Sequence, residues 1–178
     1  FTETVATSNL NSVLSGSAYN ASKGSSVISK NCGTSISHTN YDTRCGYVAS
    51  RLTDAAITGS HSASGRWNGV NTTNVNTSIT LTLNNYNSVN DVCGFAVHMF
   101  NRPSATINLP SYVDIEVSKN GTNFYKVGRV YAPDTKQENF VYSLHLTKLL
   151  SAKKVRFTFP ATNGYMWIEE IEVYANRS

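Results

Sequence analysis

The stretch SYVDIEVSKNGTNFYKVGRVY, residues 111–131, decides the fold of this chain. Over residues 113–118, apolar side chains alternate with Asp, Glu and Ser, the period-two pattern of a strand with one buried and one solvated face. Asn120-Gly121 accepts the positive φ angles of a tight turn, and residues 124–130 have the pattern of a return strand. This stretch therefore predicts a β-hairpin.

The rest of the chain is made of similar material. Short alternating or apolar segments are separated by Asn, Ser, Thr and Gly, and we expect further strands at residues 17–28, 78–83, 92–100, 140–146, 155–159 and 168–174. The segments between them predict a lead-in at residues 1–10, a polar loop at 33–44, a short helical turn within 46–57 and a long loop at 58–77. About eight strands at regular spacing are typical of a β-sandwich. We predict an all-β fold, an eight-stranded jelly-roll β-sandwich.

Composition favours a single extracellular module. With 178 residues the chain can bury one two-sheet core, so we expect one domain over residues 1–178. Only 15% of residues are charged, and the net charge of +4 is spread along the chain, so we expect no nucleic-acid partner. No apolar run approaches the roughly 18 residues of a membrane span. Because no signal peptide precedes Phe1, we expect a mature, monomeric module cut from a larger secreted protein.

The reactive residue types do not form a recognisable catalytic motif. Cys32 and Cys45 flank a polar loop and could be bridged, whereas Cys93 lies in an apolar run and is expected to be a buried thiol. Neither Cys nor His has zinc-site spacing, and the four histidines stand in unrelated contexts. We therefore expect a non-catalytic domain, with a small polysaccharide-active β enzyme as the less favoured alternative.

Acidic residues at two distant places suggest a cation. Asp54 begins a polar loop, and Glu169-Glu170 lie on the last predicted strand with Glu172 close behind. Because like charges repel, a group of carboxylates is stabilised either by solvent or by a hard cation such as Ca²⁺, which takes six to eight oxygen ligands. The alternative is that Asp54 caps its loop and the glutamates are solvated edge residues.

Three separated stretches resemble one known family. The hairpin residues V-D-I-E-V-S with N-G-T-N-F (113–118 and 120–124) are similar to the V-x-V-S-x-D-G-x-x-F/W hairpin of discoidin-like, galactose-binding-like domains. The L-T-D sequence that ends at Asp54 and the closing E-I-E-V-Y of residues 170–174 complete the set, and the resemblance covers residues 11–175. This family includes the coagulation factor C-type domains and many bacterial carbohydrate-binding modules. The resemblance implies the jelly-roll sandwich, with ligand loops clustered at one end.

The resemblance also implies a structural Ca²⁺ site. In these domains an Asp after a short apolar segment and the first Glu of E-I-E-V supply carboxylates, and two backbone carbonyls complete the set. By this correspondence the ligands are the carboxylates of Asp54 and Glu170 and the carbonyls of Arg51 and Glu169. The chain departs from the family pattern just after Asp54, where Ala55 and Ala56 replace the usual Gly and Asn or Asp. Thr58 or Ser60 could supply the missing oxygens.

Sugars are bound by aromatic faces that stack on a pyranose and by planar polar groups that take its hydroxyls. Aromatic side chains stranded in polar loops are the stacking candidates: Tyr41, Trp67, Phe100 and Tyr165. Arg102, stiffened by Pro103, and its neighbour Asn101 are the polar candidates, and the resembling modules carry an Arg and an Asn in this loop. Two alternatives stay open. Trp67 could pack in the core, and Arg102 could simply pair with Asp91 or Glu138 on the surface.

These observations predict a secreted carbohydrate-binding module that docks its parent protein onto a polysaccharide or glycan. A shallow loop-borne site of this kind binds weakly and gains strength by multivalency. The competing function is cell-surface adhesion or lipid recognition, which discoidin-like domains also perform. The sequence does not indicate which sugar is bound.

Overall fold

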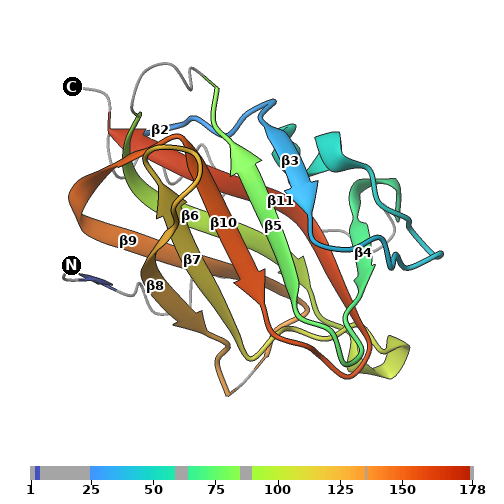
Figure 1. Cartoon of the computed structure of the whole chain (residues 1–178). Coiled ribbons are helices and arrows are strands. Elements are labelled where there is room, and N and C mark those ends of the chain that lie inside the picture. Colours follow the sequence, from blue (N-terminus) through green and yellow to red (C-terminus); the bar gives the residue numbers. More distant parts are fainter. Residues whose placement is uncertain (1–2, 5–24, 59–63, 85–89, 135, 177–178) are drawn as a thin grey trace.

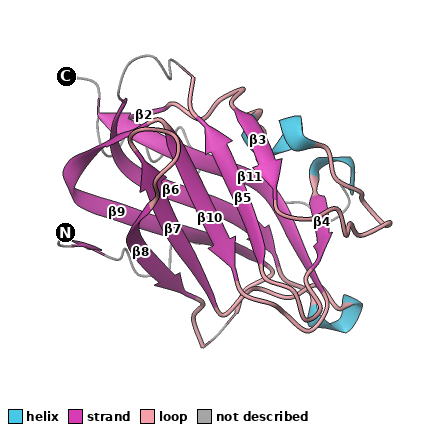
Figure 2. Ribbon diagram, in the orientation of Figure 1, coloured by secondary structure: helices cyan, strands magenta, loops and turns pink. Residues whose placement is uncertain are grey.

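The computed structural model describes residues 3–4, 25–58, 64–84, 90–134 and 136–176, and it places them in two antiparallel sheets that pack face to face (Figures 1 and 2). The six-stranded sheet has the order β1-β9-β6-β11-β2, with β4 also paired to β11, and the five-stranded sheet has the order β3-β5-β10-β7-β8. The strands are β1 (Glu3–Thr4), β2 (Ser25–Val27), β3 (Gly33–Ile36), β4 (Asn68–Asn71), β5 (Thr77–Thr82), β6 (Asn90–Phe100), β7 (Tyr112–Ser118), β8 (Tyr125–Tyr131), β9 (Asn139–Ala152), β10 (Lys154–Phe159) and β11 (Tyr165–Asn176).

Helical structure in the described residues is limited to three short 3₁₀ turns, η1 (Ala49–Thr53), η2 (Ser64–Arg66) and η3 (Pro103–Ala105). The helical turn predicted within residues 46–57 is confirmed as η1. None of these turns is long and apolar enough to cross a membrane.

The core lies between the two sheets. Strands β5 and β10 alternate strictly between buried and half-buried residues, and β7 does so over most of its length, because one face of each points at the opposite sheet. The longer strands β6 and β11 contribute residues such as Phe95 and Ile171, and Phe95 meets Phe157 of β10 edge to face at 6.2 Å between ring centroids. The predicted all-β sandwich is confirmed, and its alternating segments are the strands that build the core.

The opening hairpin is confirmed, although its turn is longer than a two-residue loop. Strands β7 and β8 pair from Tyr112 opposite Tyr131 to Val117 opposite Tyr125, which leaves residues 119–124 as the connection. Gly121 has φ +85°, as the sequence predicts. Asn120 acts through its side chain, because its Oδ1 accepts hydrogen bonds from the amides of Thr122 and Asn123 at 2.9 and 2.8 Å.

The described residues form more strands than the eight predicted. Strand β3 lies in the predicted polar loop, and β4 lies in the predicted long loop. Both are four residues long and rich in Gly, Ser, Thr and Asn, so their sequences lack the apolar alternation that marks the others. Of the predicted strand at residues 17–28, the part up to residue 24 lies outside the described residues, and the described part contains only β2. Of the predicted lead-in at residues 1–10, only β1 lies within the described residues.

Candidate functional site

Segments from four parts of the chain meet at one end of the sandwich. Isolated bridges join Tyr41 to Val70 of β4, and Ile107 to both Arg102 and Tyr165. Because β4 and β6 both pair with β11, these bridges bring the loop after β3, the loop after β6 and the start of β11 together. We call the half-exposed side chains at this end the rim: Tyr41, Arg44, Arg102 and Tyr165.

The floor of the rim is a buried aromatic cluster. Trp67, Phe100 and Trp167 have ring centroids 5.2 to 6.3 Å apart, and they lie on the face of the six-stranded sheet that points away from the five-stranded sheet. Trp67 is 1% exposed and Phe100 is fully buried. The prediction that these two rings stack on a ligand is therefore wrong for the described conformation, and the alternative position of Trp67 in the core is confirmed.

Above this floor lies Arg44, a residue that the sequence analysis did not select. The Asp42 carboxylate accepts hydrogen bonds from Nε and Nη2 of Arg44 and from the indole Nε1 of Trp167, at 2.9, 2.6 and 2.8 Å. Nη1 of Arg44 donates to the carbonyl of Ala105 at 2.7 Å. The guanidinium lies over the rings of Tyr165 and Trp167, 4.7 and 5.5 Å from their centroids. Arg44 is thus a fixed cationic plane with 40% of its side chain exposed.

Electrostatics supports this arrangement. Burial alone would raise the pKa of Asp42, but the hydrogen bonds from Arg44 and Trp167 outweigh it and hold the pKa below its usual value. Hydrogen bonding to Asp42 raises the pKa of Arg44. Both groups are therefore ionised at neutral pH. A bidentate pair of this kind orients the guanidinium more than it adds net charge.

Two predicted ligand residues flank Arg44. Tyr165 is half-buried beneath the guanidinium. Tyr41 stacks on Tyr47 with centroids 4.8 Å apart and planes 6° apart, and both tyrosines are half-buried. Each ring therefore has one side committed to the protein. What remains for a ligand is the outer edge of both tyrosines and the exposed plane of Arg44.

Arg102 and Asn101 have different environments. Arg102 pairs with Glu138 through Nη2 at 2.5 Å and lies over Phe100, and a third of its side chain is exposed, so the predicted alternative pairing with Glu138 is observed. Asn101 is 8% exposed, and its Oδ1 is buried without a hydrogen-bond partner in the described residues. The prediction that Asn101 presents its amide to a ligand is therefore wrong for this conformation, whereas the guanidinium of Arg102 is partly exposed.

The acidic residues are brought together by an irregularity in β11. The pairing register between β11 and β6 shifts between Ile168 and Glu170, so Glu169 is the extra residue of a β-bulge. The bulge turns Glu169 and Glu170 to the face away from the core, where the polar loop that begins at Asp54 covers them. Both are buried, at 1% and 0% exposure, so the alternative of solvated glutamates is wrong.

Glu169 and Glu170 hold this loop from beneath. The amide and hydroxyl of Thr58 donate to Oε1 of Glu169 at 2.5 and 2.6 Å, and the amide of Ala55 donates to Oε1 of Glu170 at 3.2 Å. Ser60, the other predicted substitute ligand, lies outside the described residues. Glu172 makes its hydrogen bonds elsewhere, to His98 and Tyr174.

One carboxylate oxygen of this group has no partner. Oε2 of Glu170 is buried and accepts no hydrogen bond from the described residues. Burial is the main reason that the pKa of Glu170 rises to about 10, and the nearby charges of Glu172 and Asp54 add to it. A cation beside Glu170 would satisfy that oxygen and offset the cost of burial, whereas the described residues contain no group of three or more His, Cys, Asp or Glu side chains that could hold a metal ion.

Asp54 already has a cationic partner. Nη2 of Arg66 donates to both of its carboxylate oxygens at 2.7 Å and to the carbonyl of Ala56 at 3.1 Å. Asp54 Oδ1 also accepts from the amide of Ala56, as the alternative capping role requires. Binding of a metal ion would compete with Arg66 for Asp54. The predicted carbonyl ligands belong to Arg51 on η1 and Glu169 at the bulge.

Comparison with known proteins rests on structure. No family model matches the sequence, and no curated protein is similar to it. Among solved structures, the chain is similar to the module CpGH89CBM32-5 of Clostridium perfringens in complex with GalNAc-β-1,3-galactose, with a TM-score of 0.60 and 18% identity over 84% of this chain and 100% of that one. The family 32 module of C. perfringens NanJ in complex with galactose gives 0.59 and 16%, over 84% and 98%. A fucose-binding module of Streptococcus pneumoniae gives 0.59 and 15%, over 86% and 97%.

These similarities establish the fold. The chain has the antiparallel two-sheet sandwich fold of these solved modules, as the hairpin and the closing strand indicate.

Proposed function

We propose that this chain is a non-catalytic carbohydrate-binding module whose sugar site is the rim. The observation that carries the proposal is the fixed Arg44 plane over Tyr165, with Arg102 across the bridged loop at the same end. Planar guanidinium groups take vicinal hydroxyls in pairs, and the exposed tyrosine edges contact the apolar side of a pyranose. The similar modules bound to galactose and to GalNAc-β-1,3-galactose support a neutral sugar as the ligand.

The proposal extends to the setting of the module. It would dock a larger secreted or cell-surface protein onto a polysaccharide or glycan, through single weak contacts strengthened by multivalency. Lipid recognition at the rim would require protruding apolar side chains with basic neighbours. The large hydrophobic side chains with substantial exposure among the described residues are Val48, Tyr125, Tyr131 and Leu149, and no rim residue is among them, so sugar binding is the better supported function.

A glycan array followed by titration tests the sugar site. We expect retention on galactose- or fucose-containing glycans, and we expect Arg44→Ala and Arg102→Ala each to lower the affinity at least tenfold. Arg129→Ala is the matched control, because Arg129 pairs with Asp114 on the other sheet and Lys126 still neutralises that carboxylate after the change. Unchanged affinity in both rim variants would remove the rim from the site.

We also propose a structural Ca²⁺ held by the carboxylates of Asp54 and Glu170 with the carbonyls of Arg51 and Glu169. The support is the buried, unpartnered oxygen of Glu170 next to a second carboxylate. Such an ion would fix the loop that follows Asp54 against β11. We expect EDTA to lower the melting temperature of the wild type and to have no effect on Asp54→Ala. A wild-type melting temperature that is the same in EDTA and in Ca²⁺ would refute the ion.

A further inference from the structure

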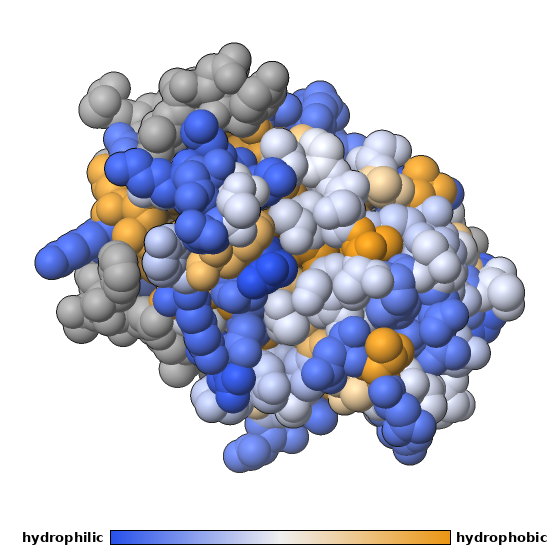
Figure 3. Space-filling view, viewed as in Figure 1, coloured by the Kyte–Doolittle hydropathy of each residue, from blue (hydrophilic) through white to orange (hydrophobic). Residues whose placement is uncertain are grey.

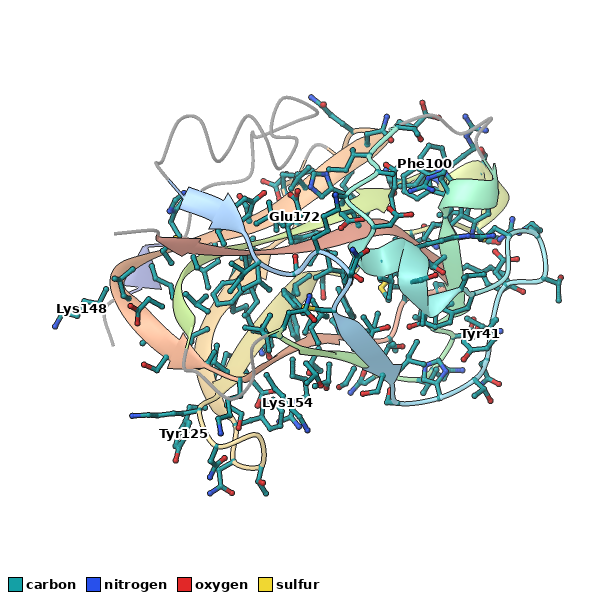
Figure 4. The ribbon with its side chains drawn as sticks, turned by 90° about the horizontal axis from the view of Figure 1, so that it is seen from above. Tyr41, Phe100, Tyr125, Lys148, Lys154 and Glu172 are labelled. Atoms are coloured by element: carbon teal, nitrogen blue, oxygen red, sulfur yellow. The ribbon has the colours of Figure 1, made fainter. Side chains whose placement is uncertain are left out.

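A hollow lies at the end of the sandwich opposite the rim, between β7, β8 and the end of β9. Val117 of β7, Val127 of β8 and Leu150 of β9 line a groove of about 300 Å³ together with Tyr125. An adjoining hollow of about 430 Å³ is lined by Lys119, Asn120, Tyr125 and Lys153. Figure 4 shows Tyr125 and Lys148 on one side of the molecule and Tyr41 and Phe100 on the other, so this hollow is separate from the rim.

Tyr125 is the most prominent feature of the hollow. Its partner in the β7–β8 register is Val117, which points into the core, so Tyr125 points the same way and emerges at the open mouth between the sheets. It is 59% exposed, far more than an aromatic ring in a core. The neighbouring Phe124 differs, because the guanidinium of Arg156 covers its ring at 4.1 Å. Tyr125 therefore offers a ring that nothing in the described residues covers.

Lysines surround this ring, and one acid, Asp91, lies opposite the groove residue Ser151 in the β6–β9 register. Lys119, Lys153 and Lys154 make no ion pair with any acidic residue in the described part of the chain. The two nearest acids on β7 are already neutralised: Asp114 pairs with Lys126 and Arg129, and Glu116 pairs with Arg156. The hollow thus has a local excess of positive charge, which attracts an anion. In Figure 3, hydrophobic surface where β9 bends lies beside strongly hydrophilic residues.

The turn at the edge of the hollow is rigid and presents a hydrogen-bond donor. The amide of Gly121 donates to the hydroxyl of Ser118 at 2.9 Å, and the amides of Thr122 and Asn123 donate to Oδ1 of Asn120. Because Oδ1 is engaged in this way, the side-chain orientation of Asn120 is fixed and its Nδ2 remains available to donate outward. The amide of Lys153 donates to the carbonyl of Ser118 at 2.8 Å, which ties β10 to the same turn.

We propose that this hollow is a second binding site, for an acidic sugar unit of a polysaccharide. The pyranose ring lies on Tyr125, its carboxylate or sulfate group lies between the ammonium groups of Lys119 and Lys153, and a hydroxyl accepts from Nδ2 of Asn120. An aromatic face, an amide donor and two cations in one hollow match the three chemical features of such a sugar. This inference does not depend on the sugar specificity of the rim.

An anionic membrane is the other surface that lysines and apolar residues could meet. Membrane insertion requires several protruding apolar side chains. Here the exposed large hydrophobic residues among those described are Tyr125 and Leu149, and the apolar floor of the groove is recessed. The side-chain amide of Asn120 would also find no hydrogen-bond partner among the acyl chains of a membrane. The observations therefore favour the acidic sugar.

Binding to acidic and uncharged polysaccharides tests the proposal, and dextran is the uncharged polymer with the same backbone as dextran sulfate. The probes are polygalacturonate, dextran sulfate and uncharged dextran, and vesicles containing phosphatidylserine serve as the membrane probe. We expect the full chain to bind at least one acidic polymer, to bind dextran at least tenfold more weakly, and to leave the vesicles unbound. Because the cations are exposed, raising the salt concentration weakens this binding.

Variants separate the specific site from general attraction. Lys119→Gln/Lys153→Gln should lower the affinity at least tenfold, whereas Lys30→Gln/Lys136→Gln removes two charges from exposed positions elsewhere and should change it less than twofold. Tyr125→Ala should lower it at least fivefold, and Tyr125→Phe, which keeps the ring, should restore it. Equal losses in the two lysine pairs, an unaffected Tyr125→Ala, or binding to the vesicles alone would overturn the proposal. Arg102→Ala, which acts at the rim, should leave acidic-polymer binding intact.

Discussion

Glu170 is the residue whose titration would test the proposed metal ion. Its unpartnered oxygen and its raised pKa, about 10, mean that without a cation the carboxyl is neutral in the folded protein at pH 7. The unfolded chain ionises this group from pH 4.5 upward, so between about pH 4.5 and 10 the folded state holds more protons. Stability in that window must therefore fall as pH rises.

We accordingly expect opposite effects of Glu170→Gln in the two conditions. Protonating a carboxyl of ordinary pKa 4.5 at pH 7 costs about 3 kcal/mol, so in EDTA the neutral amide should stabilise the fold by up to that amount and flatten its pH dependence. In Ca²⁺ the same change removes a charged ligand and should destabilise. Urea unfolding at pH 5, 7 and 9, in EDTA and again in Ca²⁺, measures both effects. A variant less stable than the wild type in EDTA would show that Glu170 has another partner.

At the scale of elements, the rim depends on a close backbone approach at the start of β11. Gly164 has φ +143°, and its carbonyl accepts a hydrogen bond from the amide of Thr72 at 2.9 Å. A Cβ at this position would collide with the carbonyl oxygen of Thr106, in the loop that also carries η3. Only glycine lets these two segments approach so closely while keeping that φ.

Gly164→Ala should therefore separate the loop after β6 from β11. We expect a loss of about 1 to 3 kcal/mol in the free energy of unfolding, the usual range for overpacking, together with weaker sugar binding at the rim. Gly33→Ala is the matched control, because a Cβ on Gly33 has no atom within 4 Å and its φ is not positive, so its stability should hardly change. Equal stability of the two variants in chemical denaturation would contradict this account of the rim.

Across the whole molecule, sequence patterns predict the layers better than the surface. The alternating segments at β5, β7 and β10 identify the core because every second side chain is buried by the opposite sheet. Burial of Trp67 and Phe100 depends on loops that cover the outer face of the six-stranded sheet, which local sequence does not reveal. Arg44 was missed for the same reason. Its orientation depends on Asp42, whose carboxylate also accepts a hydrogen bond from Trp167, 125 residues further along the chain.

The sandwich also keeps its two proposed sites apart. The rim and the hollow lie at opposite ends, and a close-packed core of interlocking strands lies between them. Neither site includes a residue of the other, and no element that could switch between two arrangements joins them in the described structure, so ligands at the two sites should not compete. Titration calorimetry with an acidic oligosaccharide, with and without a saturating neutral glycan, should give dissociation constants within about twofold, a coupling below about 0.5 kcal/mol. A tenfold difference would mean either that both ligands occupy the rim or that binding at one end rearranges the other. Arg102→Ala separates these two cases. It should abolish the difference if both ligands occupy the rim and should leave it if binding at one end rearranges the other.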